Sequence, residues 1–130
     1  MEQDSPKKQS RLKSFAVAFR GLKIIFVGER NFRIQLLLGL FAVIACFFFQ
    51  VTTSEWIVVL LLIAVILSTE ALNTCIEYIC DYISPEYHHM IKKIKDVAAG
   101  AVLLCVIIAV VITCIIFIPY IHNMLSVGVR

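Results

Sequence analysis

Charged residues are scarce in this chain of 130 residues: Asp, Glu, Lys and Arg together make up 16% of it. Soluble domains carry roughly 25% charged and about 45–50% apolar residues, whereas the apolar share here is 61%. The composition argues against a soluble globular protein and excludes a disordered tail. Glycine and proline are also few, at five and three residues, which excludes a collagen-like chain. A small integral membrane protein of one domain, residues 1–130, is the class that remains.

Several sequence motifs are also missing. The chain has no G-x-x-x-x-G-K-[ST] loop, no nucleophile elbow and no dinucleotide fingerprint, so any nucleotide must be held in another way. No nucleic-acid-binding motif accompanies the net charge of +3, which argues against a nucleic-acid partner. The five cysteines form no C-x-x-C pair and are expected to be buried small hydrophobes: Cys46, Cys75, Cys80, Cys105 and Cys114.

Three long apolar runs predict three transmembrane helices. Residues 34–51 and 97–118 carry no charge, and Pro119 is expected to end the second of these runs. A run over 56–83 is apolar as far as Thr69 and then continues with acidic residues embedded in it. The runs over 34–51 and 97–118 are close to the roughly 20 residues that cross a ~30 Å hydrocarbon layer as a helix, and the run over 56–83 is longer than that. The fold class is therefore an all-α integral membrane protein.

The distribution of basic residues predicts the orientation. The link at 52–55 has no Lys or Arg, and after Pro119 only Arg130 is basic. Basic residues gather instead before the first run and between the second and third: Lys7, Lys8, Arg11, Lys13, Arg20, Lys23, Arg30, Arg33, then Lys92, Lys93 and Lys95. Because cytoplasmic loops carry the excess of Lys and Arg, we expect a multi-pass protein of the cell membrane with its N-terminus in the cytoplasm.

Residues 10–33 are predicted to form an amphipathic helix at the membrane surface. Apolar residues recur there at steps of three and four, which places them on one stripe: Leu12, Phe15, Phe19, Leu22 and Phe26. Lys13 and Arg20 fall off the stripe, and Lys23 falls near it. Two interpretations stay open, a helix that covers a site at the cytoplasmic boundary and a basic amphipathic anchor.

The strongest functional pattern lies at the cytoplasmic end of the second run. Glu70, Asn73, Glu77 and Asp81 are spaced so that one helix face carries all of them. A charge at membrane depth costs at least ~2.5–3.5 kcal/mol, and such side chains normally face a protein interior, a cavity or an ion. These residues therefore predict a polar site close to the cytoplasmic face.

The chemistry of that site is left with two interpretations. With Glu29 and Asp96, the three acids of the helix face would make an oxygen-rich cage that suits Mg²⁺, which is often held by one or two carboxylates together with substrate phosphates. In the other interpretation the acids are polar glue between helices, paired with Lys92 or Lys95. The pattern predicts a divalent-metal or proton site and does not by itself specify a reaction.

An ordered set of motifs resembles a known family, the prokaryotic diacylglycerol kinases and undecaprenol kinases. The resemblance covers roughly residues 14–120 and rests on these elements: Phe19-Arg20-Gly21-Leu22-Lys23, Glu29-Arg30-Asn31-Phe32-Arg33, Glu70-x-x-Asn73-x-x-x-Glu77-x-x-x-Asp81, Pro85-Glu86-Tyr87-His88 and Lys95-Asp96-x-Ala98-x-Gly100-Ala101-Val102. It implies a homotrimeric membrane enzyme with three spans and an N-terminal surface helix. The implied reaction is transfer of the γ-phosphate of Mg-ATP to the hydroxyl of a membrane lipid alcohol. Residues 29–33 and 85–88 favour undecaprenol, with diacylglycerol next.

The resemblance also implies roles for individual residues. Glu70 would be the base that takes the proton from the lipid hydroxyl, and Glu29 and Glu77 would hold Mg²⁺. The nucleotide contacts would come from Arg11, Glu86, Tyr87, His88, Lys95 and Asp96, with Lys13 an alternative to Arg11, and the supporting residues would be Asn73, Asp81 and Arg33. An aromatic that some members place in the surface helix is Val17 here, which leaves the base contacts of that helix open.

Plainer interpretations accompany these assignments. Asp96 suits a cap of the third span, Lys95 a cytoplasmic anchor, and Ser84-Pro85-Glu86 an ordinary helix start. The small residues Ala101, Cys105 and Ala109 suit close helix packing. Two other function classes are an ion- or proton-coupled transporter, which would prefer acids near mid-membrane, and a non-catalytic membrane scaffold, which needs no Glu70.

Overall fold

The computed structural model describes the backbone of residues 11–127 and the side chains of 13–126. This part of the chain forms four helices and no strand: α1 (Arg11–Gly28), α2 (Arg30–Phe49), α3 (Thr53–Ile83) and α4 (His89–Val127). The last three are long and apolar enough to cross a membrane. The chain is therefore an all-helical, multi-pass membrane protein.

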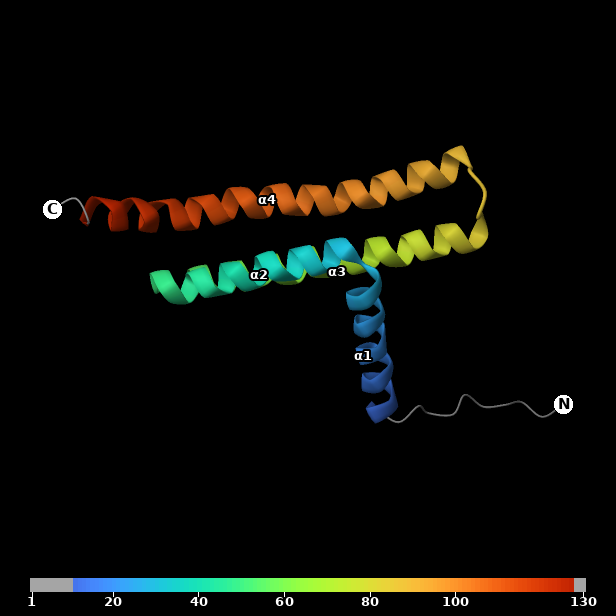
Figure 1. Ribbon diagram of the computed structural model, residues 1–130, viewed down its shortest axis with the longest axis horizontal. Coiled ribbons are helices and arrows are strands. Elements are labelled where there is room, and N and C mark those ends of the chain that lie inside the picture. Colours follow the sequence, from blue (N-terminus) through green and yellow to red (C-terminus); the bar gives the residue numbers. More distant parts are fainter. Residues whose placement is uncertain (1–10, 128–130) are drawn as a thin grey trace.

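The three apolar helices run side by side along the long axis of the molecule, and α1 runs across them (Figure 1). The corner between α1 and α2 lies beside α3, partway along its length (Figure 1). Beyond this corner, α3 and α4 continue together to their connection at residues 84–88. The polar end of α3 is thus placed between this corner and that connection.

A sharp break separates α1 from α2. The sequence pattern carries the surface helix to residue 33, but α1 ends at Gly28, and Glu29 is extended at φ −103° and ψ 116°. Arg33 stabilises the break, because its Nη1 donates hydrogen bonds to the carbonyl oxygens of Phe26 at 3.1 Å and Val27 at 2.7 Å. These carbonyls belong to the last turn of α1. Carbonyl oxygens in the last turn of a helix have no hydrogen-bond donor within that helix, so Arg33 supplies one.

Three sequence-based expectations about the third span and the link before it are wrong. Pro119 does not end the helix but lies inside α4, which continues to Val127. Proline is tolerated in membrane helices because neighbouring groups and local adjustments satisfy the freed backbone. Pro85 does not begin a helix either, since residues 84–88 are not helical and α4 begins at His89. Asp96 consequently lies inside α4 and does not cap it.

A hydrophobic core lies at the end of the bundle that is remote from residues 84–88. A core cluster there comprises Cys46, Val51, Val59, Ile116 and Phe117. Thr52 caps α3 through a reciprocal pair of hydrogen bonds with Glu55. From α4, the hydroxyl of Tyr120 donates to Oε2 of the same Glu55 at 2.8 Å. All three apolar helices are therefore joined at this end.

The five cysteines are free thiols and are not uniformly buried. Cys46 and Cys80 are buried and Cys105 is half-buried, whereas Cys75 and Cys114 are exposed on this chain. The expectation of burial is therefore wrong for these last two positions. It fails because the apolar side chains of a membrane helix also face outward, so an apolar sequence context does not imply a protein interior.

Replacing Tyr120 by Phe should lower the thermal unfolding midpoint in detergent by about 2–5 °C, because Glu55 loses a hydrogen-bond donor while the aromatic packing remains. The control is Tyr82→Phe, since Tyr82 is 91% exposed and its hydroxyl contributes no such link. Equal midpoints for the two variants would show that the contact between Tyr120 and Glu55 does not stabilise the bundle.

Candidate active site

The polar face of α3 runs from the protein interior toward its exposed end. Glu70 is 3% exposed and Asn73 is 8% exposed. One and two turns further on, Glu77 is half-buried and Asp81 is exposed. Of the three acids on this face, Glu70 is therefore the one whose carboxylate is buried, and burial of a carboxylate is costly unless the group is bound.

Glu70 is bound by a neutral side chain from another helix. Nε2 of Gln35 on α2 donates a hydrogen bond to Oε2 of Glu70 at 3.0 Å. Thr74 Oγ1 donates to the backbone carbonyl of Glu70 at 3.1 Å and does not reach its carboxylate. Sequence reasoning missed Gln35, although a signal was present, because it is a polar residue near the start of an otherwise apolar run.

Two polar atoms close to this helix face have no partner. Asn73 Nδ2 donates to Glu77 Oε1 at 2.9 Å, which leaves Asn73 Oδ1 buried and unpaired among the described residues. The same holds for Oε1 of Gln35, the residue that bonds Glu70. Buried acceptors are nearly always satisfied, so a water, a ligand or another chain must complete them.

Glu29 approaches α3 from the corner between α1 and α2. Its Oε1 accepts a hydrogen bond from the hydroxyl of Tyr78 at 3.3 Å, and Tyr78 directly follows Glu77. The absence of a side chain at Gly28 makes room for this contact, since a Cβ there would lie 3.3 Å from the Tyr78 hydroxyl oxygen. Tyr78 is the second residue that sequence reasoning missed, and no pattern in the sequence indicated it.

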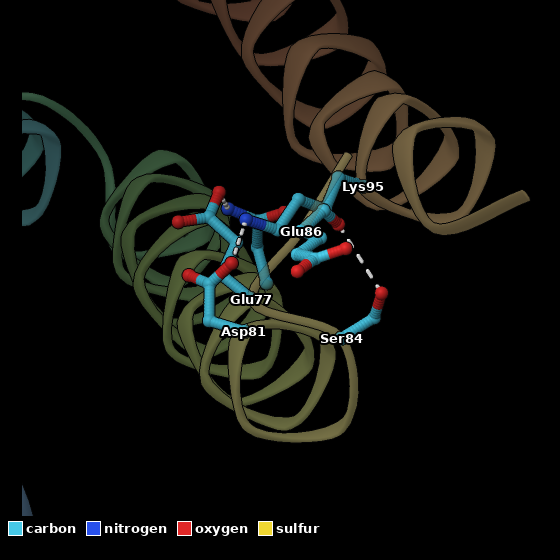
Figure 2. Close-up of polar contacts among 6 residues, drawn as sticks. Glu77, Asp81, Ser84, Glu86 and Lys95 are labelled. Carbon is cyan, nitrogen blue, oxygen red and sulfur yellow. Dashed lines mark hydrogen bonds and ion pairs between the residues drawn. The ribbon is translucent and has the colours of Figure 1, made fainter. Parts of the chain in front are cut away.

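Lysines from α4 pair with two of the five acids that were expected to form the cage. Figure 2 shows Lys95 reaching from α4 to Asp81 on α3, with the Glu77 carboxylate beside it. Asp96 instead pairs with Lys92 on its own helix at 3.1 Å. Both pairs are at least partly exposed and contribute little to stability.

The five-acid cage is not formed. Among residues 13–126, no group of three His, Cys, Asp or Glu side chains is placed to hold a metal ion. The ion pair between Lys95 of α4 and Asp81 of α3 fits the interpretation in which the acids join helices. Neither of the two ion pairs involves Glu70. The buried base candidate therefore stands apart from the exposed ion pairs.

The link between α3 and α4 carries three of the expected nucleotide contacts. Ser84 Oγ donates to the backbone carbonyl of Glu86 at 3.2 Å, which shapes the turn in Figure 2. His88 Nδ1 accepts a hydrogen bond from the backbone N–H of Met90 at 3.2 Å and so caps α4. Glu86 and Tyr87 are exposed. The side chain of Arg11 lies outside the described residues.

Comparison with known proteins identifies the family. Residues 16–117 match the family described as prokaryotic diacylglycerol kinase. The chain belongs to this family. It is 37% identical over 107 residues to an undecaprenol kinase of Bacillus subtilis (strain 168), a match that covers 82% of this chain and 87% of the relative. It is 29% identical over 104 residues to a diacylglycerol kinase of Escherichia coli (strain K12), covering 80% and 85%.

A diacylglycerol kinase of Synechocystis sp. (strain ATCC 27184 / PCC 6803 / Kazusa) is 35% identical over 102 residues, which is 78% of this chain and 58% of the relative. Members of the family are lipid kinases, so this chain is an ATP-dependent phosphotransferase and not a transporter or a scaffold. In this lipid kinase, hydrogen bonds and ion pairs join Glu70 to α2, Asp81 to α4 and Glu29 to α3.

Replacing Arg33 by Gln should loosen the corner that carries Glu29, because the carbonyls of Phe26 and Val27 lose their donor. Hydrogen–deuterium exchange of the amides in residues 25–31 should accelerate by about fivefold or more, since local opening costs less free energy. Arg30→Gln is the matched control, as Arg30 is exposed on the same helix. If both variants exchange like the wild type, Arg33 does not stabilise this corner.

Proposed function

We propose that this lipid kinase transfers the γ-phosphate of Mg-ATP to the hydroxyl of undecaprenol, with diacylglycerol as the next acceptor. The observation that carries the proposal is the buried carboxylate of Glu70, which is bound by an amide and has no ion pair with a described Lys or Arg. The choice of undecaprenol is supported by the 37% identity to a relative named undecaprenol kinase.

Glu70 acts as the general base in this proposal. The O–H bond of the lipid breaks and its proton passes to the Glu70 carboxylate, while the lipid oxygen forms a bond to the γ-phosphorus. The bond from the γ-phosphorus to the bridging oxygen breaks, and ADP leaves with that electron pair. A base at 3% exposure is shielded from bulk water, which limits transfer of the phosphate to water.

Glu29 and Glu77 are the residues that we propose to hold Mg²⁺. Each uses Oε1 in a hydrogen bond, to Tyr78 and Asn73 respectively, and keeps Oε2 outside any hydrogen bond between described residues. Oxygen donors of this kind suit Mg²⁺, which takes one or two carboxylates together with substrate phosphates. The bound ion would neutralise charge on the phosphates of ATP.

The remaining site residues are proposed to position these groups or to contact ATP. Asn73 orients Glu77, Asp81 orients Lys95, and Arg33 stabilises the corner that carries Glu29. The nucleotide contacts that the resemblance implies are Arg11, Glu86, Tyr87, His88, Lys95 and Asp96. Lys95 has the clearest structural support, because it lies beside the Glu77 carboxylate in Figure 2 and brings a positive charge to the proposed metal ligand.

The lipid chain is proposed to lie in an apolar groove of about 520 Å³ between α2, α3 and α4. Gln35 lines this groove and also bonds Glu70, so the proposed base lies one hydrogen bond away from the groove lining. Most of the lining is aliphatic or aromatic, including Leu38, Ala42, Ile66 and Val110. An isoprenoid chain that ends in one hydroxyl matches this lining, because its only polar atom would lie beside Gln35 and Glu70.

We further propose a homotrimer with its N-terminus and active site on the cytoplasmic side. The trimer rests on the resemblance, and the orientation rests on the Lys and Arg residues before α2 and around residues 92–95. The exposed apolar side chains of α1 support its place at the membrane surface, among them Phe15 at 66% and Phe19 at 70% exposed. The molecular mass of the detergent-solubilised protein tests the trimer.

Glu70→Gln should lose nearly all phosphate transfer from Mg-ATP, by about 100-fold or more, because the amide cannot accept the lipid proton. Purified enzyme in detergent is assayed with undecaprenol and with diacylglycerol side by side, and undecaprenol should give the higher kcat/KM. The control is Glu55→Gln, the same substitution at the remote end of α3. Equal turnover by wild type and Glu70→Gln would remove the proposed base.

Removing divalent cations with EDTA should abolish transfer, and added Mg²⁺ should restore it. Glu77→Gln should raise the Mg²⁺ concentration for half-maximal rate by about tenfold or more, since one carboxylate ligand is lost. The rate is measured against Mg²⁺ at saturating ATP and lipid, again with Glu55→Gln as control. An unchanged Mg²⁺ requirement in Glu77→Gln would exclude Glu77 as a ligand.

A further inference from the structure

Gln35 provides the one side-chain hydrogen bond that the Glu70 carboxylate receives from the described residues, at 3.0 Å. The other acids of α3 are bound differently. Glu77 is held by Asn73 from its own helix, and Asp81 by a lysine from α4. Only Glu70 depends on α2, so the placement of the base depends on how α2 packs against α3.

The hydrogen bond distinguishes the two carboxylate oxygens of Glu70. Oε2 accepts the N–H of Gln35, while Oε1 has no hydrogen-bond donor among the described residues. A carboxylate oxygen that already accepts a donor is a weaker proton acceptor than a free one. Oε1 is therefore the oxygen available for a proton.

The carbonyl oxygen of the Gln35 side chain, Oε1, is the other polar atom of this amide. It is buried and has no partner among residues 13–126, and Gln35 lines the apolar groove between the three membrane helices. Gln35 is the amide at the junction of this groove with Glu70, because it contributes to the lining of one and bonds the other.

We propose that Gln35 is a positioning residue for the base: its Nε2–H group binds Oε2 of Glu70 and leaves Oε1 to receive the proton of the lipid hydroxyl. This inference rests on the proposed function of Glu70. The proton moves from the lipid oxygen to Glu70 Oε1, and Gln35 neither gains nor loses one. Gln35 acts through Glu70, so its removal changes the chemical step and leaves ATP binding intact.

The first test replaces Gln35 by Leu, which has similar volume and no hydrogen-bonding atoms. The kcat for lipid phosphorylation should fall by about 10–100-fold, the loss expected when a hydrogen bond to a charged group is removed. The KM for Mg-ATP should change by less than about twofold. Gln35→His, which keeps an N–H donor, should recover most of the lost kcat. The control is Thr69→Val, because the Thr69 hydroxyl bonds the carbonyl of Val65 and not Glu70.

A double-mutant cycle separates positioning from packing. In Glu70→Asp the carboxylate is one methylene shorter and no longer reaches Gln35, so adding Gln35→Leu should cost less than about twofold. An equal loss in both backgrounds would show that Gln35 acts by packing and would overturn the inference, as would a wild-type kcat in Gln35→Leu. If Glu70→Gln is itself fully active, the proposed function fails. If Glu70→Gln is inactive and Gln35→Leu behaves as wild type, only the role of Gln35 fails.

Discussion

The structure depends on how one carboxylate is kept inside an apolar bundle. Burying a charge without compensation is prohibitive, so Glu70 needs a donor, and the donor comes from a different helix as the amide of Gln35. An amide offers a hydrogen bond without neutralising the charge, which a lysine at the same place would do. The carboxylate is thereby held in position and remains a proton acceptor. A carboxylate that is paired with a cation is a weaker base, because the cation stabilises the form without the proton.

From Glu70 outward, the polar groups of α3 become more exposed, and the outermost of them, Asp81, is paired with a cation. Asn73 holds Glu77, and Lys95 holds Asp81 at the end where water reaches the helix. This order matches the substrates of a lipid kinase. The acceptor hydroxyl is attached to a chain dissolved in the bilayer, whereas ATP arrives from water with several negative charges. A gradient of burial along one helix is a direct way to bring both to the same place.

The sequence predicted the helical class, the three spans and the polar face of α3, because all of these follow from hydrophobic runs and helical periodicity. It did not predict the break at Glu29, because apolar and basic residues continue across it and the capping role of Arg33 depends on folded geometry. The lysine partners of Asp81 and Asp96 were named among the alternatives, but the choice between pairing and a cage depends on which rotamers meet. Gln35 and Tyr78 are visible only once separate helices are packed together.

The core cluster around Cys46, Val59 and Phe117, and the link from Tyr120 to Glu55, lie at the end of the bundle opposite the link at 84–88. Val59 and Phe117 of this cluster also line the groove proposed for the lipid chain, whereas none of its residues is among those proposed to react or to contact ATP. A substitution in the mostly exposed link at 84–88 is expected to affect folding little, and one in the core cluster leaves the contacts of Glu70, Glu77 and Asp81 in place. A change of acceptor alcohol would therefore be constrained where the lipid chain meets this cluster, because the residues that line the groove there also keep the helices assembled.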